Sequence, residues 1–214
     1  MAVEAKICGL TRPEDAALAV RLGAAYLGVV FAGGPRVVTR VQAREVVCAA
    51  GRVPVLGVFA GQSLDEILEV CRETGLRGVQ LHGGYDAPAA DALRREGLVV
   101  WRVARLAGRF GPGALAAFAA GADAVLVEPR VEDRLGGAGV PLPLELAARA
   151  RQELADHRMV LAGGLTPESV SRAMTLVQPD LVDVSSGVEL APGIKDPDRL
   201  ARFLEAVVGH HAPT

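Results

Sequence analysis

Short runs of β-branched and other apolar residues alternate with amphipathic segments along the chain, and this alternation repeats eight times. Apolar residues in the amphipathic segments recur at i, i+3, i+4 and i+7, which is the period of a helix. The expected strands are residues 5–8, 26–31, 54–59, 78–81, 99–103, 124–127, 159–161 and 181–184. The clearest expected helices are residues 13–22, 64–74, 87–96, 167–176 and 197–208. The alternation predicts an α/β protein.

Several expected helices carry sequence signals at their ends. "TRPED", "LTPES" and "KDPDR" place proline in the first turn with acids just inside, and "RLGA", "ETGL" and "REGL" place glycine where a helix stops. No linker or low-complexity segment interrupts the eight strand-helix units. We therefore predict that residues 1–214 form a single (β/α)8 TIM barrel domain. An open doubly wound sheet is the structural alternative, although eight units exceed its usual six strands.

Composition excludes several classes of function. Half of the residues are hydrophobic but only 4% are aromatic, which suits a core of small and branched aliphatic side chains. The formal net charge of −2 provides no broad positive field for nucleic acid or an anionic membrane, so we expect a small-molecule partner.

Cysteine usage and the N-terminal sequence bear on localisation. The three cysteines form no C-x-x-C pair or Cys/His cluster, so neither a disulfide framework nor a metal site is indicated. No signal-like N-terminus or run of 18 apolar residues occurs. A cytoplasmic protein is predicted.

Active sites of (β/α)8 barrels lie on the loops that follow the carboxyl ends of the strands. Cys8, in "KICGLT", stands at the end of the first strand. It is either a small buried packing residue or a partly exposed thiol whose pKa a nearby cation lowers, able to act as a base or nucleophile. Glu128, in "ADAVLVEPR", is either a working acid or the first solvated residue after the sixth strand.

Two further polar side chains follow the second and fourth strands. Arg36, in "FAGGPRVVTR", is either a fork for a carboxylate or phosphate or a solvated loop arginine. His82, in "VQLHGG", could bind, titrate or hydrogen-bond to neighbouring backbone, and we assign it a supporting role.

The strongest local signal is a pair of glycine-rich turns after the last two strands. "LAGGLTPES" and "DVSSGVE" stand where barrels commonly bind a phosphate. Backbone N–H groups of Gly163, Gly164, Ser186 and Gly187 could cradle that phosphate, and "GGAG" after the sixth strand could complete the enclosure. The alternative is that both turns serve chain reversal alone.

Together these motifs resemble the phosphoribosylanthranilate isomerase family of tryptophan biosynthesis. The resemblance runs in order through "KICGLT", "GVF", "VQLHG", "GGAG" and "LAGGLTPESV" to "VDVSSGVELAPGIKD". The first and last of these motifs together are highly specific. The resemblance implies a single (β/α)8 barrel that needs neither a metal nor an organic cofactor.

The implied reaction is the Amadori rearrangement of N-(5-phosphoribosyl)anthranilate to 1-(2-carboxyphenylamino)-1-deoxyribulose 5-phosphate. A general acid protonates the ring oxygen and a general base removes the C2 proton. By resemblance Cys8 is the base, and Arg36 faces the anthranilate carboxylate. The glycine turns, with Gly137 of "GGAG", bind the phosphoribosyl part. Asp183 binds a ribose hydroxyl, assists protonation or organises its neighbours.

The sequence departs from the family pattern around the sixth strand. The family acid is usually Asp in "LLD", whereas "VLVE" places Glu128 there, with one more methylene. The usual "GGTG" is "GGAG", and the aromatic "FDW" that follows is replaced by "VPLPLE". These changes predict a slower enzyme or a changed preference for the aryl group.

Two other functions and two assembly states stay open. Another cofactor-free isomerase or lyase acting on a ribose phosphate is the alternative enzyme, and a catalytically silent sugar-phosphate binding protein is the alternative outside enzymes. A pure binder has no need of Cys8, Arg36 and a carboxylate at position 128 together. The chain is expected to be a monomer or a homodimer.

Overall fold

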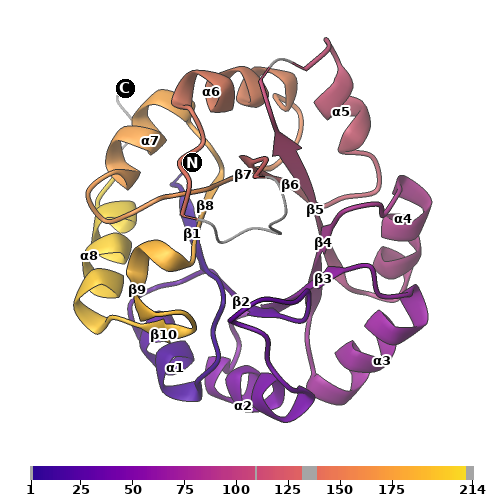
Figure 1. The fold of residues 1–214 in the computed structure, drawn as a ribbon, viewed down its shortest axis with the longest axis vertical. Helices are drawn as coiled ribbons and strands as arrows, with labels where there is room; N and C mark the ends of the chain where they lie inside the picture. Colours follow the sequence, from indigo (N-terminus) through magenta and orange to yellow (C-terminus); the bar gives the residue numbers. More distant parts are fainter. Residues whose placement is uncertain (1, 109, 132–138, 211–214) are drawn as a thin grey trace.

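The computed structural model, which describes residues 2–108, 110–131 and 139–210, contains a closed barrel of eight parallel strands (Figure 1). The strands follow one another around the barrel in chain order, and β1 (Glu4–Ile7) pairs with both β2 (Tyr26–Val30) and β8 (Leu181–Val184). The predicted (β/α)8 barrel is confirmed. The open-sheet alternative is wrong, because an open sheet leaves its edge strands unpaired.

The other strands and the helices alternate around this barrel. The remaining barrel strands are β3 (Val55–Ala60), β4 (Gly78–His82), β5 (Val99–Leu106), β6 (Ala124–Pro129) and β7 (Met159–Ala162). The helices are α1 (Pro13–Arg21), α2 (Arg40–Ala50), α3 (Leu64–Thr74), α4 (Ala87–Arg95), α5 (Ala114–Phe118), α6 (Leu144–Glu153), α7 (Val170–Val177) and α8 (Pro197–Val208). Figure 1 shows them as a ring outside the strands.

Three features differ from the sequence prediction. Strands β5 and β6 run two to three residues further than expected, because their pairing continues to Leu106 and Pro129. Helix α7 begins at Val170, since the residues from Thr166 form a turn in which the Ser169 hydroxyl accepts from the Thr166 N–H. A 3-10 turn, η1 (Ser186–Val188), and a hairpin of β9 (Glu189–Ala191) and β10 (Ile194–Lys195) lie between β8 and α8.

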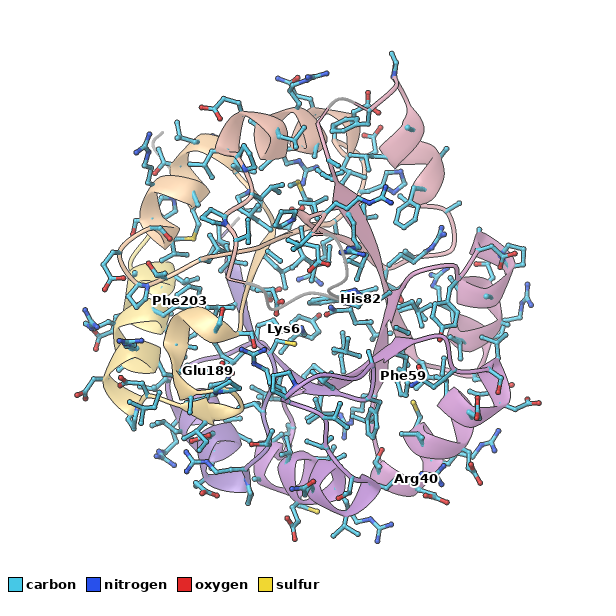
Figure 2. The ribbon with its side chains drawn as sticks, in the orientation of Figure 1. Lys6, Arg40, Phe59, His82, Glu189 and Phe203 are labelled. Atoms are coloured by element: carbon cyan, nitrogen blue, oxygen red, sulfur yellow. The ribbon has the colours of Figure 1, made fainter. Side chains whose placement is uncertain are left out.

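The core has two parts because successive side chains of a strand point to opposite faces. Outward residues such as Ile7, Val125 and Val127 pack against the helices, together with Phe203 of α8 (Figure 2). Inward residues fill the barrel with a second apolar cluster: Leu56, Trp101, Val103, Ala124, Leu126, Val160, Ala162 and Leu181.

The same alternation builds a polar layer above that inner cluster. On β6, Glu128 has the parity of the inward residues Ala124 and Leu126. Buried polar side chains of matching parity stand on the other strands: Lys6, Gln80 and His82. These side chains meet at the carboxyl end of the barrel, where the fold places its active sites.

No helix within the described ranges is long and apolar enough to cross a membrane.

Candidate active site

Glu128 lies inside β6 and points into the barrel, with only 6% of the residue exposed. The reading of Glu128 as the first solvated residue is therefore wrong, because the strand continues past it. Its Oε1 lies 3.7 Å from His82 Nδ1 and 3.7 Å from Arg105 Nε, and no described residue makes a hydrogen bond to it. Burial raises the Glu128 pKa to about 7, with Arg105 opposing the shift. This carboxyl can hold a proton near neutral pH.

His82 is the last residue of β4 and is buried near the centre of the barrel (Figure 2). Its Nε2 lies 3.0 Å from the Gln80 side-chain nitrogen, so its partner is a side chain and not the neighbouring backbone, which was one of its three possible roles. Its Nδ1 has no hydrogen-bond partner in the described part of the chain. Burial, then the charges of Lys6 and Arg105, lower the His82 pKa to about 4. The imidazole is therefore neutral at pH 7.

Lys6 is a fully buried cation that joins several strands at the barrel centre (Figure 2). Its Nζ donates to Asp183 Oδ1 at 2.8 Å and to Gln80 Oε1 at 2.9 Å. Burial lowers the Lys6 pKa, but the carboxylate of Asp183 and the neighbouring Cys8 outweigh burial and raise it overall. Asp183 therefore organises its neighbours, as one of its expected roles requires, and it also lines the cavity described below.

Cys8 directly follows β1 and is buried, which agrees with the first of its two readings and not with a partly exposed thiol. Cations do stand close by. A Cβ on Gly28 would lie 2.9 Å from Cys8 Sγ and 3.1 Å from Lys6 Nζ, so the thiol and the ammonium meet over this glycine. Burial raises the Cys8 pKa, although Lys6 and Lys195 oppose the shift. The lowered pKa that one of the two readings of Cys8 requires is therefore not found, because desolvation of the thiolate exceeds the attraction of the cations.

Arg36 is neither solvated nor unpaired. Its Nε and Nη2 form a fork with Glu189, at 2.9 and 2.7 Å, and its side chain is 13% exposed. Glu189 also accepts from the fully buried Lys195 at 2.8 Å. Lys195 donates in turn to the carbonyl of Cys8 at 2.6 Å. Thus the unpredicted β9–β10 hairpin, which carries Glu189 and Lys195, supports the loop after β1 and the loop after β2.

The glycine-rich turns after β7 and β8 enclose one cavity with the end of β6. Its lining includes Glu128 and Asp183 together with the predicted phosphate residues Gly163, Gly164, Ser186 and Gly187. The two turns touch so closely that a Cβ on Gly187 would lie 1.9 Å from the Leu165 carbonyl oxygen. Gly139 and Val140 also line this cavity, whereas Gly137 lies outside the described residues.

Four residues of the polar centre escaped the sequence analysis: Lys6, Gln80, Arg105 and Lys195. Each of Lys6, Gln80 and Arg105 points to the same side of the sheet as a predicted site residue on the same or a paired strand. For example, Gln80 and His82 are two positions apart on β4. Reading each strand with a period of two would have found them. Lys195 stands in the quoted "PGIKD", but no local pattern indicates its partner, because it reaches Cys8 across 187 positions of the chain.

Within the described ranges, no three His, Cys, Asp or Glu residues are grouped closely enough to hold a metal ion.

Comparison with known proteins assigns this site to a family. A family model described as N-(5'phosphoribosyl)anthranilate (PRA) isomerase matches residues 5–206. An N-(5'-phosphoribosyl)anthranilate isomerase of Chlorobium luteolum is 40% identical over 207 residues, which cover 94% of this chain and 95% of that protein.

Solved structures agree over nearly the whole length. The phosphoribosylanthranilate isomerase of Thermus thermophilus has a TM-score of 0.84 at 33% identity, with 97% of this chain and 99% of that chain covered. A phosphoribosylanthranilate isomerase in complex with reduced 1-(o-carboxyphenylamino)-1-deoxyribulose 5-phosphate has a TM-score of 0.82 at 30% identity, with the same coverage. The chain therefore belongs to the N-(5'-phosphoribosyl)anthranilate isomerase family and is an isomerase of tryptophan biosynthesis.

Proposed function

We propose that this chain converts N-(5-phosphoribosyl)anthranilate to 1-(2-carboxyphenylamino)-1-deoxyribulose 5-phosphate, with Glu128 as general acid and Cys8 as general base. One observation carries the assignment. A buried carboxyl that retains its proton near neutral pH lines the same cavity as the glycine turns suited to a phosphate. A relative bound to the reduced form of the proposed product supports the substrate class.

The first step opens the sugar ring. Glu128 gives its proton to the furanose oxygen, the C1–O bond breaks, and the anthranilate nitrogen supplies its lone pair to form a C1–N iminium. A pKa of about 7 suits this transfer, because near neutral pH the acid is then protonated in much of the protein and still strong enough to donate.

The second step moves a proton from carbon. The Cys8 thiolate removes the C2 proton, and the C2–H electron pair forms the C1–C2 double bond while the iminium pair returns to nitrogen. The resulting enolamine becomes the ketone when C1 gains a proton and the C2 hydroxyl loses one. Burial raises the Cys8 pKa, so the thiol must lose its proton before it acts, and the charge of Lys6 offsets part of that cost.

Substrate binding uses the two ends of the site. The turns at Gly163, Gly164, Ser186 and Gly187 hold the phosphate through backbone N–H groups. Arg36 Nη1, which no described residue engages, takes the anthranilate carboxylate while the fork to Glu189 holds the guanidinium in place.

The test replaces each catalytic residue and follows anthranilate fluorescence. Cys8→Ala and Glu128→Ala should each lower kcat by about a hundredfold or more, the usual contribution of an acid or base. Cys48→Ala and Glu145→Ala are matched controls, because both residues are exposed on helices. Near-normal rates in both active-site variants, with folding intact, would refute the roles.

Growth of an auxotroph and turnover of other sugar phosphates separate the alternative functions. A silent binding protein would leave a tryptophan auxotroph that lacks this step without growth. Turnover of another sugar phosphate, with no fluorescence change on phosphoribosylanthranilate, would favour a different isomerase or lyase. Growth of the auxotroph with the wild-type chain, lost in Glu128→Ala, is the expected result.

A further inference from the structure

A line of five side chains crosses the barrel centre from β8 to β6. Asp183 accepts from Lys6, Lys6 donates to Gln80 Oε1, and the Gln80 amide nitrogen lies 3.0 Å from His82 Nε2. His82 Nδ1 then faces Glu128 Oε1 at 3.7 Å. Neither of these last two atoms has a hydrogen-bond partner among the described residues. The line therefore ends on the carboxyl to which we assign the acid role.

The chemistry of these groups fixes the direction of each hydrogen bond. An ammonium can only donate, so the Gln80 atom that faces Lys6 must be the carbonyl oxygen. The amide nitrogen of Gln80, which also can only donate, is thereby turned toward His82 Nε2. His82 Nε2 must accept, and the ring proton must be on Nδ1. The imidazole proton is consequently on the nitrogen that lies 3.7 Å from Glu128 Oε1.

The surroundings keep this imidazole neutral. A proton on Nε2 would oppose the N–H of Gln80, and the cations Lys6 and Arg105 add to the cost. A neutral donor differs from a cation in one way that matters here: it can stabilise the Glu128 carboxylate without protonating it.

We propose that Gln80 and His82 are positioning residues, in which Gln80, oriented by Lys6, fixes the Nδ1–H tautomer of His82 so that its N–H stabilises the Glu128 carboxylate formed on proton donation. This proposal rests on the assignment of Glu128 as the acid. At 3.7 Å the contact is too long for a hydrogen bond in the resting site. The interaction between His82 and Glu128 therefore strengthens as negative charge develops on the carboxylate. It raises kcat rather than the affinity for substrate.

The first test needs no substrate. Nitrogen-15 NMR of the imidazole in the wild-type chain should show neutral His82 with its proton on Nδ1 from pH 6 to pH 8. An Nε2–H tautomer or an imidazolium at pH 7 would overturn the proposal. Gln80→Glu places a second acceptor opposite Nε2, so it should move the proton to Nε2 and lower kcat at least tenfold with KM within twofold. A shifted tautomer with unchanged kcat would also overturn it.

A second test uses two amides as imidazole substitutes. The Asn amide nitrogen can stand near the position of Nδ1, whereas that of Gln reaches the position of Nε2. His82→Asn should therefore retain most of the kcat that His82→Gln and His82→Leu lose, about tenfold to a hundredfold for one donor to a developing charge. Equal losses in Asn and Gln variants of equal thermal stability would mean that His82 serves packing alone.

A double-mutant cycle separates this proposal from the proposed function. If His82 acts through Glu128, His82→Leu should cost little further kcat in a Glu128→Gln background. An equal loss in both backgrounds overturns the positioning role and leaves the acid role intact. Full activity of Glu128→Gln itself would instead refute the acid role, whatever the His82 tautomer.

Discussion

Arg105 on β5 and Glu128 on β6 are register partners, and Arg105 Nε lies 3.7 Å from Glu128 Oε1. Burial raises the pKa of this carboxyl to about 7, and Arg105 opposes the shift. The balance between burial and the charge of Arg105 sets the pH at which the proposed acid loses its proton.

Arg105→Gln should raise the Glu128 pKa above about 7, because the substitution removes the positive charge that opposes the effect of burial. The thiolate fraction of Cys8, whose pKa is also raised, increases with pH over the same range, so the rate profile reports both groups together. The measurement is therefore the carbon-13 shift of the Glu128 side-chain carboxyl against pH, with the exposed Arg77→Gln before β4 as the control. An unchanged titration midpoint in Arg105→Gln would show that the arginine does not act on this carboxyl.

Glu128→Asp should lower kcat by about a hundredfold, although the resemblance described above implies Asp at this position. The longer side chain carries the carboxyl to within 3.7 Å of both His82 and Arg105 in this barrel. Shortening it by one methylene withdraws the carboxyl by about an ångström, which can cost that much rate. Steady-state kinetics decide the matter. An equal or faster Asp variant would mean that the site does not depend on the extra methylene.

Lys6→Met should destabilise the fold by about 3 kcal/mol, because it leaves the carboxylate of Asp183 without its buried partner. Asp183→Asn in the same chain should restore part of that loss, since the uncompensated charge is then removed. Urea unfolding of the single and double variants at pH 7 measures both effects. Additive losses would show that the ion pair makes no specific contribution.

Glu189→Gln should make the free energy of unfolding depend less on pH in the acid range. Burial opposes ionisation of Glu189, but Arg36 and Lys195 outweigh it and lower the Glu189 pKa below 4.5. A carboxylate with a lowered pKa stabilises the fold above its unfolded pKa and loses that contribution as pH falls through the folded value. The wild type should therefore lose more stability than the variant between pH 5 and pH 3. Equal losses of unfolding free energy in the wild type and the variant over that range would contradict this prediction.

Gly187→Ala should raise KM by tenfold or more, because the new Cβ would lie 1.9 Å from the Leu165 carbonyl oxygen and force the two glycine turns apart. Inorganic phosphate should become a weaker competitive inhibitor in parallel. Gly84→Ala is the control, since Gly84 is exposed and a Cβ there meets nothing within 4 Å. Unchanged inhibition by phosphate in Gly187→Ala would place the phosphate elsewhere.

The barrel and its strand ends could be predicted from the sequence because they depend on local periodicity. Alternating strand and helix patterns determined the fold class, and the position of Cys8, His82 and Glu128 at strand ends placed them at one rim. The resemblance supplied the reaction. The choice between monomer and homodimer, the cytoplasmic location and the absence of a cofactor stay predictions.

The state of each site residue was decided by tertiary structure. Burial depends on what the other strands bring, so the sequence left the state of Cys8 open, whereas the fold buries the thiol and raises its pKa. Arg36 was read as exposed or substrate-facing, yet Glu189, 153 positions away, holds it in a fork. Charged side chains on β1, β5, β6 and β8 meet only when the barrel closes. Desolvation together with those distant charges shifts the pKa values of Lys6, Cys8, His82 and Glu128.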